Sequence, residues 1–214
     1  MQSSDHPAAA STHRLLTLGV LAGPIYLAVG LAQALLRSGF DLRRHPLSVL
    51  ENGPGGWIQV ANFVVVGAMV IAAAVGIRRV LGSSSRAVSW FLGAFGASMI
   101  AAAVFWADPM DGFPIGTPIG PPKSISTSGL LHFAAGGLGF VSLAVSCLFA
   151  ARAMSRRNTR SLARASLISG LVILAGFFGG MAIPHSSPVL GIWIAVVVGW
   201  AWLSAMSRHL DRQP

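Results

Sequence analysis

The residues of this sequence that could do chemistry are a few imidazole and carboxyl groups beside long apolar runs. Asp108 and Asp111 follow one apolar run, and His132 lies just inside the next. An ionisable residue within such a run is costly to bury and is by default a candidate for function. His45 lies in a polar stretch further upstream. The candidate catalytic residues are therefore Asp108, His132 and His45.

Carboxylate and imidazole side chains together support two kinds of chemistry. They are the ligands of zinc and similar divalent metals, and they also form general acid–base pairs. Each residue also has a structural alternative, because His132 could simply bond a neighbouring helix and Asp108-Pro109 could simply stop one. If a metal is bound, its candidate ligands are Asp108, Asp111, His132 and His185.

A second group of polar residues could hold a ligand or a lipid headgroup. Arginine recognises phosphate and carboxylate well, and Arg43 and Arg44 adjoin His45. Gln59 and Asn62 are three residues apart and share one face of a helix. Ser48 completes this group of binding candidates.

Ser48 has a structural interpretation as well, because Glu51 follows it by three residues. This Ser-x-x-Glu spacing is that of a capping box, in which each side chain takes a free backbone donor at a helix start. The pattern predicts a short interfacial helix over the membrane.

The elements that must position these residues are membrane-spanning helices. The 214 residues are 54% hydrophobic and 10% charged, whereas a soluble domain carries about 25% charged residues. The apolar runs are apolar at consecutive residues, which is typical of spanning helices and not of barrel strands. We predict an all-α bundle of six transmembrane helices arranged as three tandem hairpins, at about 15–36, 57–77, 88–107, 129–153, 162–183 and 189–206.

The ends of the chain are predicted to be cytoplasmic. Eleven of the fifteen Lys and Arg residues fall in the tails and in the loops after the second and fourth helices, and such residues favour the cytoplasmic side. Residues 1–14 are predicted to be a disordered tail and residues 208–214 a second tail. The first run contains Ala32-Gln33-Ala34, which has the form of a signal-peptide cleavage site. Its length and Gly19-Val-Leu-Ala-Gly23, a close-packing face, favour a retained helix.

Most of the candidate residues therefore belong to two longer loops that are predicted to lie on the outer face. Gln59, Asn62 and His132 lie in helices near that face, and His185 lies just beyond the fifth helix. The second loop has Gly112, Gly116 and Gly120 at intervals of four among several prolines. This composition excludes a regular helix and predicts a lid over the helix ends.

Two segments of the chain resemble a known family. The stretch from Asp41 to Phe63, running on to Gly76-Ile-Arg-Arg79, and the stretch Phe105–Pro114 with Gly129-Leu-Leu-His132 are similar to a bacterial membrane family catalogued as domain of unknown function 998. The resemblance covers nearly the whole chain and implies a six-helix protein of the bacterial cytoplasmic membrane, without an established activity. It also implies a shared outer-face site at Arg44, His45, Ser48, Gly53, Trp57, Asn62, Asp108 and His132.

Several functions stay open at this point. An enzyme or binder that acts on a lipid or hydrophobic substrate leads, followed by a small-molecule transporter or an accessory membrane protein. Haem electron transfer is weaker, because the histidines offer one axial pair, His132 with His185. The expected partners are membrane lipids and a second copy or another membrane protein. Nucleic acid is not expected, because the arginines lie in short clusters between apolar runs.

Overall fold

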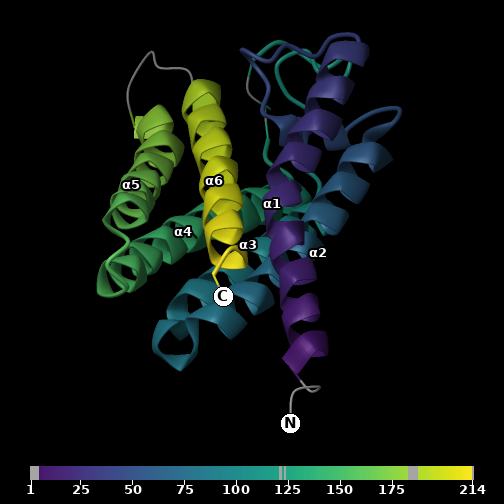
Figure 1. Ribbon diagram of the computed structural model, residues 1–214. Helices are drawn as coiled ribbons and strands as arrows, with labels where there is room; N and C mark the ends of the chain where they lie inside the picture. Colours follow the sequence, from purple (N-terminus) through teal and green to yellow (C-terminus); the bar gives the residue numbers. More distant parts are fainter. Residues whose placement is uncertain (1–4, 121, 123, 183–187, 214) are drawn as a thin grey trace.

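The protein is built from helices joined by irregular loops, and its described residues contain no strand (Figure 1). The computed structural model describes residues 5–120, 122, 124–182 and 188–213. The six long helices are α1 (Asp5–Leu36), α2 (Gly56–Leu81), α3 (Arg86–Val104), α4 (Thr127–Arg156), α5 (Arg160–Ala182) and α6 (Pro188–Asp211), with short 3-10 helices η1 (Leu47–Glu51) and η2 (Ser83–Ser85).

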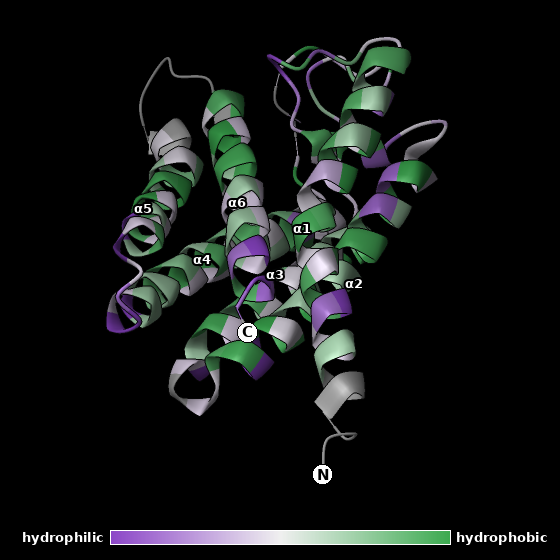
Figure 2. Cartoon of the chain, in the orientation of Figure 1, coloured by the Kyte–Doolittle hydropathy of each residue, from purple (hydrophilic) through white to green (hydrophobic). Residues whose placement is uncertain are grey.

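Each of these six helices is long and apolar enough to cross a membrane. Hydrophilic residues concentrate in the connecting loops and at the helix ends, while the middles of the helices are hydrophobic (Figure 2). Large apolar side chains such as Trp90, Leu138 and Ile168 are exposed on the bundle, as expected where lipid is the solvent. The predicted all-α bundle of six spanning helices is confirmed, and the chain is a multi-pass membrane protein.

The helices form a closed ring in chain order. Each helix packs against the next, and α1 also packs against α6. The predicted Gly19–Gly23 face lies in this last contact, because a side chain on Gly23 would overlap Trp200 of α6. Helix α1 thus closes the ring between α2 and α6. The grouping into three tandem hairpins stays a prediction.

Two helix ends differ from the sequence predictions. Helix α1 already begins at Asp5, so residues 5–14 are helical and not the disordered tail expected from their polarity. Helix α3 ends at Val104, three residues before the predicted end, so Asp108 does not close it. At the other side of this loop, Ser126 caps α4 by accepting the N–H of Gly129. The chain between Phe105 and Ser126 is therefore free to contact the first loop.

The basic segments assigned to one side by sequence do lie at one end of the bundle. His13 of α1 contacts Asp211 of α6 at 2.7 Å, and Arg79 of α2 donates to Ser11 at 2.9 Å. Arg157, which follows α4, donates to the carbonyl of Val80 at 3.0 Å. The loops that join α1 to α2 and α3 to α4 lie at the opposite end (Figure 1).

The ring depends on close backbone approach between α5 and α6, which gives a first prediction. A Cβ on Gly191 would lie 2.2 Å from the carbonyl oxygen of Gly176, whereas one on Gly93 would meet nothing nearer than 4.0 Å. We expect Gly191→Ala to lower the melting temperature in detergent, by overpacking worth about 1–3 kcal/mol. The control Gly93→Ala should leave it unchanged or raise it slightly, because alanine favours helix. Equal melting temperatures for the two variants would contradict this account of the packing.

Candidate functional site

The α1–α2 and α3–α4 loops are joined by a bidentate ion pair. The guanidinium of Arg44 donates to both carboxylate oxygens of Asp111, with Nε 2.7 Å from Oδ2. Asp111 Oδ1 also accepts the N–H of Gly120 at 2.9 Å. Arg44 and this backbone bond lower the pKa of Asp111 to about 2. Arg44 therefore holds the second loop to the first and is not a free headgroup ligand.

The second loop has the irregular backbone that its sequence predicts. Gly112, Gly116 and Gly120 all have positive φ angles, between 88° and 97°, where glycine alone is unstrained. Asp111 and the fully buried Phe113 connect this segment to the first loop. The segment lies over one end of the ring, as the predicted lid should.

His45 has a structural role in this interlock. It is fully buried, and its Nδ1 accepts the N–H of Asp41 at 2.9 Å. Its proton must therefore be on Nε2, which lies 3.1 Å from the carbonyl oxygen of Asp111 and donates to it. Both ring nitrogens are occupied by main chain, and none of the contacts found for His45 in the described chain involves His132. Two of the three candidate catalytic residues, His45 and His132, thus do not contact each other in the described chain.

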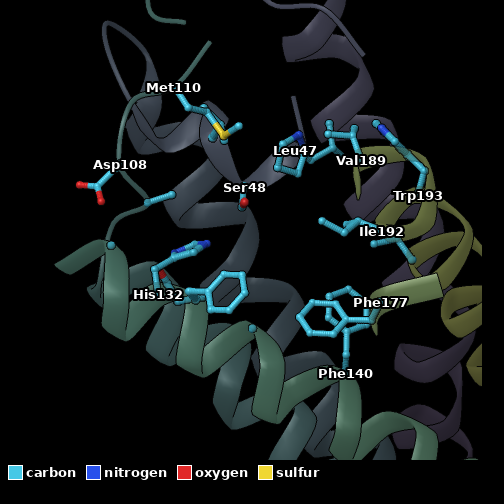
Figure 3. Close-up of a pocket in the computed structure, with 18 of the residues that line it drawn as sticks. Leu47, Ser48, Asp108, Met110, His132, Phe140, Phe177, Val189, Ile192 and Trp193 are labelled. Carbon is cyan, nitrogen blue, oxygen red and sulfur yellow. The ribbon is translucent and has the colours of Figure 1, made fainter. Parts of the chain in front are cut away.

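The ring encloses a cavity of about 680 Å³ beneath these loops, which lies within the range of about 300–1,000 Å³ usual for small-molecule sites. All six long helices contribute to its wall, mostly through apolar and aromatic side chains. Figure 3 shows Phe140, Phe177, Ile192 and Trp193 around the space, with Ser48 and His132 facing it from another side. Polar residues gather at the loop end, where Arg43, Arg44, Asp108 and Asp111 line the mouth.

His132 has a carboxyl group for a neighbour, but it is Glu51 and not Asp108. Glu51 Oε2 lies 3.4 Å from His132 Nδ1. The same Nδ1 lies 2.7 Å from the carbonyl oxygen of Phe105 and 3.2 Å from that of Ala102. These carbonyls are available because α3 has ended. His132 is 9% exposed and Glu51 is fully buried. His132 therefore forms part of the cavity wall, and Glu51 lies behind it.

The Glu51 carboxyl is costly to keep charged. Its burial raises its pKa from 4.5 to about 8, although the bond from the Ala107 N–H to Oε2, 3.2 Å long, acts in the opposite direction. Its second oxygen, Oε1, is buried with no hydrogen-bond partner among the described residues. A buried group in this state destabilises a fold unless it is protonated or given a partner. Glu51 is therefore the residue here that packing alone does not explain.

Gln59 and Asn62 belong to a buried polar cluster at the same depth. Gln59 Oε1 accepts from Gln33 Nε2 at 3.0 Å and from Asn62 Nδ2 at 3.3 Å. Asn62 also donates to the carbonyl of Tyr26, whose phenol interacts with Gln59 and lies in the field of Glu51. The alternative in which His132 simply bonds Gln59 or Asn62 does not apply, because among the described residues its polar contacts are to main chain and Glu51.

The capping box predicted for Ser48 and Glu51 is wrong. The short helix is present as η1, but Pro46 is its N-cap and no side chain caps it. The Glu51 side chain is buried in the bundle instead, where its Oε2 accepts the N–H of Ala107. Ser48 lines the cavity and has no hydrogen-bond partner in the described part of the chain.

The remaining predicted residues are dispersed. Asp108 lies at the mouth, and its Oδ2 accepts the N–H of Ser126 at the start of α4. Arg43 pairs with Asp41 and has a side chain that is 90% exposed. His185, the last metal and haem candidate, lies outside the described residues. Within the described residues no three His, Cys, Asp or Glu side chains gather as a metal site would require.

Glu51 and Tyr26 are the site residues that the sequence analysis missed. Glu51 is the only Glu in the chain and stands directly after the apolar residues Val49 and Leu50. A single Glu beside apolar residues could have indicated a functional carboxyl, but its spacing from Ser48 also fitted a capping box. Tyr26, the only Tyr, lies mid-way along an apolar run and gave no spacing signal.

A family model described as a protein of unknown function (DUF998) matches residues 20–209. The chain belongs to this family. The match includes the α1–α2 and α3–α4 loops and at least part of every helix that lines the cavity of this DUF998 chain. No curated protein and no solved structure matches it.

The raised pKa of Glu51 predicts a pH-dependent stability in this DUF998 protein. Because its pKa is about 8 when folded and 4.5 ordinarily, the folded state binds the extra proton between these values and stability falls as pH rises through them. Each unit of difference is worth about 1.4 kcal/mol. Glu51→Gln should match the wild type at pH 4 and exceed its melting temperature progressively up to pH 8. A constant difference across that range would contradict the raised pKa.

Proposed function

We propose that this protein binds a lipid-derived molecule from the membrane, with its apolar part in the central cavity and a neutral polar group beside His132. The observation that carries this proposal is a cavity of about 680 Å³ with aromatic and aliphatic walls and a few polar groups at one end. Pockets with that distribution are the usual sites for hydrophobic ligands. The ring of helices stands in lipid, so such ligands are abundant around it.

The charges at the mouth support a neutral polar group over an anionic one. Arg44 is bound to Asp111 and Arg43 to Asp41. Arg37 donates to the carbonyls of Leu50 and Asn52 and lies over the ring of Phe113. Each of these arginines therefore has a partner already, and an anionic headgroup would have to compete with a carboxylate or with main chain. An alcohol, ester or zwitterion would not have to displace these partners of the arginines.

The walls near the deep end of the cavity are built from aromatic contacts that suit an alkyl chain. Tyr26 and Phe95 pack against Trp200 with ring centroids 5.3 and 5.7 Å away, and Phe140 stacks on Phe177 at 4.7 Å. These side chains come from five different helices and leave no charged group at this depth in the described lining. A long apolar chain would be held there by burial of its surface alone.

Filling the cavity should abolish binding. Gly136 lines the cavity, and a Cβ on it would meet nothing within 4 Å, so Gly136→Phe adds an aromatic ring to empty space. We expect this variant to weaken labelling by a long-chain alcohol that carries a photoreactive diazirine by at least about tenfold, or about 1.4 kcal/mol. The measurement is crosslinking of protein in nanodiscs, with labelled residues mapped by mass spectrometry.

The matched control is Gly179→Phe, another glycine whose Cβ would meet nothing but which is not part of the cavity wall. It should label like the wild type, on residues such as Met99 and Phe140. Wild-type labelling confined to lipid-facing side chains, or equal labelling of Gly136→Phe, would show that the cavity does not take such a molecule.

We further propose that the protein lies in a bacterial cytoplasmic membrane with both termini in the cytoplasm and the cavity mouth outside, supported by the eleven basic residues at the opposite end. Cys147 is buried, so a maleimide reagent is expected to react only with a cysteine introduced at the surface. Ser124→Cys should react with an impermeant maleimide in intact cells, and the matched Ser155→Cys only after lysis. The reverse pattern would invert the proposed topology.

A further inference from the structure

His132 is held in one tautomer by its surroundings. The Nδ1 atom faces the carbonyl oxygens of Phe105 and Ala102 and Oε2 of Glu51, at 2.7, 3.2 and 3.4 Å. Three acceptors around one nitrogen require a proton there, so the lone pair of the neutral ring is on Nε2. Nε2 has no hydrogen-bond partner among the described residues, and His132 contributes to the cavity wall. A basic nitrogen thus faces the space in which the ligand is proposed to bind.

We infer that His132 is a general base for the hydrolysis of long-chain esters in the cavity, with Glu51 as its positioning residue. This inference rests on the proposed function, because the cavity must first accept the ester. An imidazole held at Nδ1 by a carboxyl group and offering Nε2 to the substrate is the arrangement that activates hydroxyl nucleophiles in acyl transfer. The neutral polar group expected at the mouth is here the ester carbonyl.

The chemistry balances with water as the only co-reactant. Nε2 takes the proton of a hydroxyl group as its oxygen forms a bond to the ester carbonyl carbon. The tetrahedral intermediate then expels the alcohol oxygen, which receives the proton back from Nε2. The net reaction converts ester and water into acid and alcohol, and His132 returns to its neutral form.

Two hydroxyl groups could be the nucleophile. Water can enter at the mouth, where Asp108 and Gly120 lie at the loop end of the cavity. The other is Ser48, whose hydroxyl faces the same cavity (Figure 3) and has no hydrogen-bond partner in the described part of the chain. In the second case an acyl group passes to Ser48 Oγ and a water molecule then removes it by the same base. The role of His132 is the same in both.

Glu51 contributes through the charge that His132 acquires. When Nε2 takes a proton the ring becomes cationic, and Oε2 of Glu51, 3.4 Å from Nδ1, stabilises it once the Glu51 carboxyl is ionised, above about pH 8. The burial of Glu51 makes this interaction stronger than it would be in water. Glu51 does not reach the cavity wall, so it acts only through the imidazole.

The test is hydrolysis of 4-nitrophenyl palmitate by the purified full-length protein in nanodiscs, followed by release of nitrophenolate. We expect His132→Gln to lower kcat by about 10²–10⁴-fold, the usual contribution of a general base, while diazirine-alcohol labelling of the cavity is retained. Turnover in His132→Gln equal to the wild type overturns the inference.

The positioning role of Glu51 has its own readout. Glu51→Gln should keep KM, melt no lower than the wild type, and lower kcat by at least about tenfold above about pH 8, where Glu51 is ionised. It should also move the midpoint of the pH–rate profile to lower pH, because the wild-type rate falls as Glu51 takes up a proton near pH 8 and glutamine cannot. A purely structural Glu51 would leave the midpoint unchanged. Since Glu51→Gln is expected to be the more stable protein at pH 8, unfolding cannot produce this result.

Further arms identify the nucleophile and separate the two proposals. If Ser48 is the nucleophile, Ser48→Ala abolishes turnover and a long-chain fluorophosphonate labels Ser48 in the wild type but not in His132→Gln. If water is the nucleophile, Ser48→Ala retains turnover, and both results support His132 as the base. Wild-type protein that takes the diazirine alcohol into the cavity but hydrolyses no ester overturns this inference and leaves the proposed function intact. Failure of both assays removes the proposed function as well.

Discussion

The backbone of Ala107 joins the α1–α2 loop to the α3–α4 loop, and the arrangement of this end of the bundle depends on that junction. Its N–H donates to Glu51 and its carbonyl accepts from Asn52, at 3.2 and 3.0 Å. Glu51 is the last residue of η1 and Asn52 follows it, so two adjacent residues of the first loop satisfy both polar groups of one residue in the second. A chain that has left a helix near lipid must find such partners, because hydrocarbon supplies none.

This junction explains why His132 is accessible to a ligand and fixed at the same time. With α3 ended at Val104, the carbonyl of Phe105 turns to Nδ1 of His132 and not to a helical N–H. The η1 turn is held from below by α1, where Leu47 fills the space left by Gly30. The geometry of one imidazole therefore depends on three separate elements that converge at the end of α3.

The cost of Glu51 is the strongest argument that this end of the molecule does more than close the ring. An apolar residue in its place would pack into the same interior without a buried oxygen that lacks a partner. The Ala107 N–H would then lose its acceptor, but a water molecule or a serine could supply one more cheaply than a carboxylate. The proposed positioning of the His132 imidazole at the cavity would explain why the fold tolerates the unfavourable burial of the Glu51 carboxyl.

The sequence predicts the helices far better than the site, for a physical reason. Membrane spans are set by runs of apolar residues, which are local, so the six helices and the irregular second loop followed from composition. The site is made by residues distant in the chain, such as Glu51 and His132, whose proximity depends on how the ring closes. His132 and Ser48 were named as candidates from their types, and the lid was correctly placed above them. The predicted topology puts Asp108 at the same membrane level as His132 and makes it the expected partner, although the fold gives that position to Glu51.

The ring also determines which ligand the site can recognise. A bundle of six helices that packs in sequence around a circle leaves its centre to be filled by side chains, and here the aromatic groups line the centre without filling it. Shape in such a space discriminates only weakly between similar alkyl chains, because each methylene contributes about 0.8 kcal/mol wherever it is buried. Discrimination must then come from the polar end, where the described arginines are already occupied by carboxylates and carbonyls. Among the described residues at that end, His132 Nε2 and Ser48 Oγ lack a hydrogen-bond partner, so the proposed ligand is expected to be distinguished by its uncharged oxygen atoms.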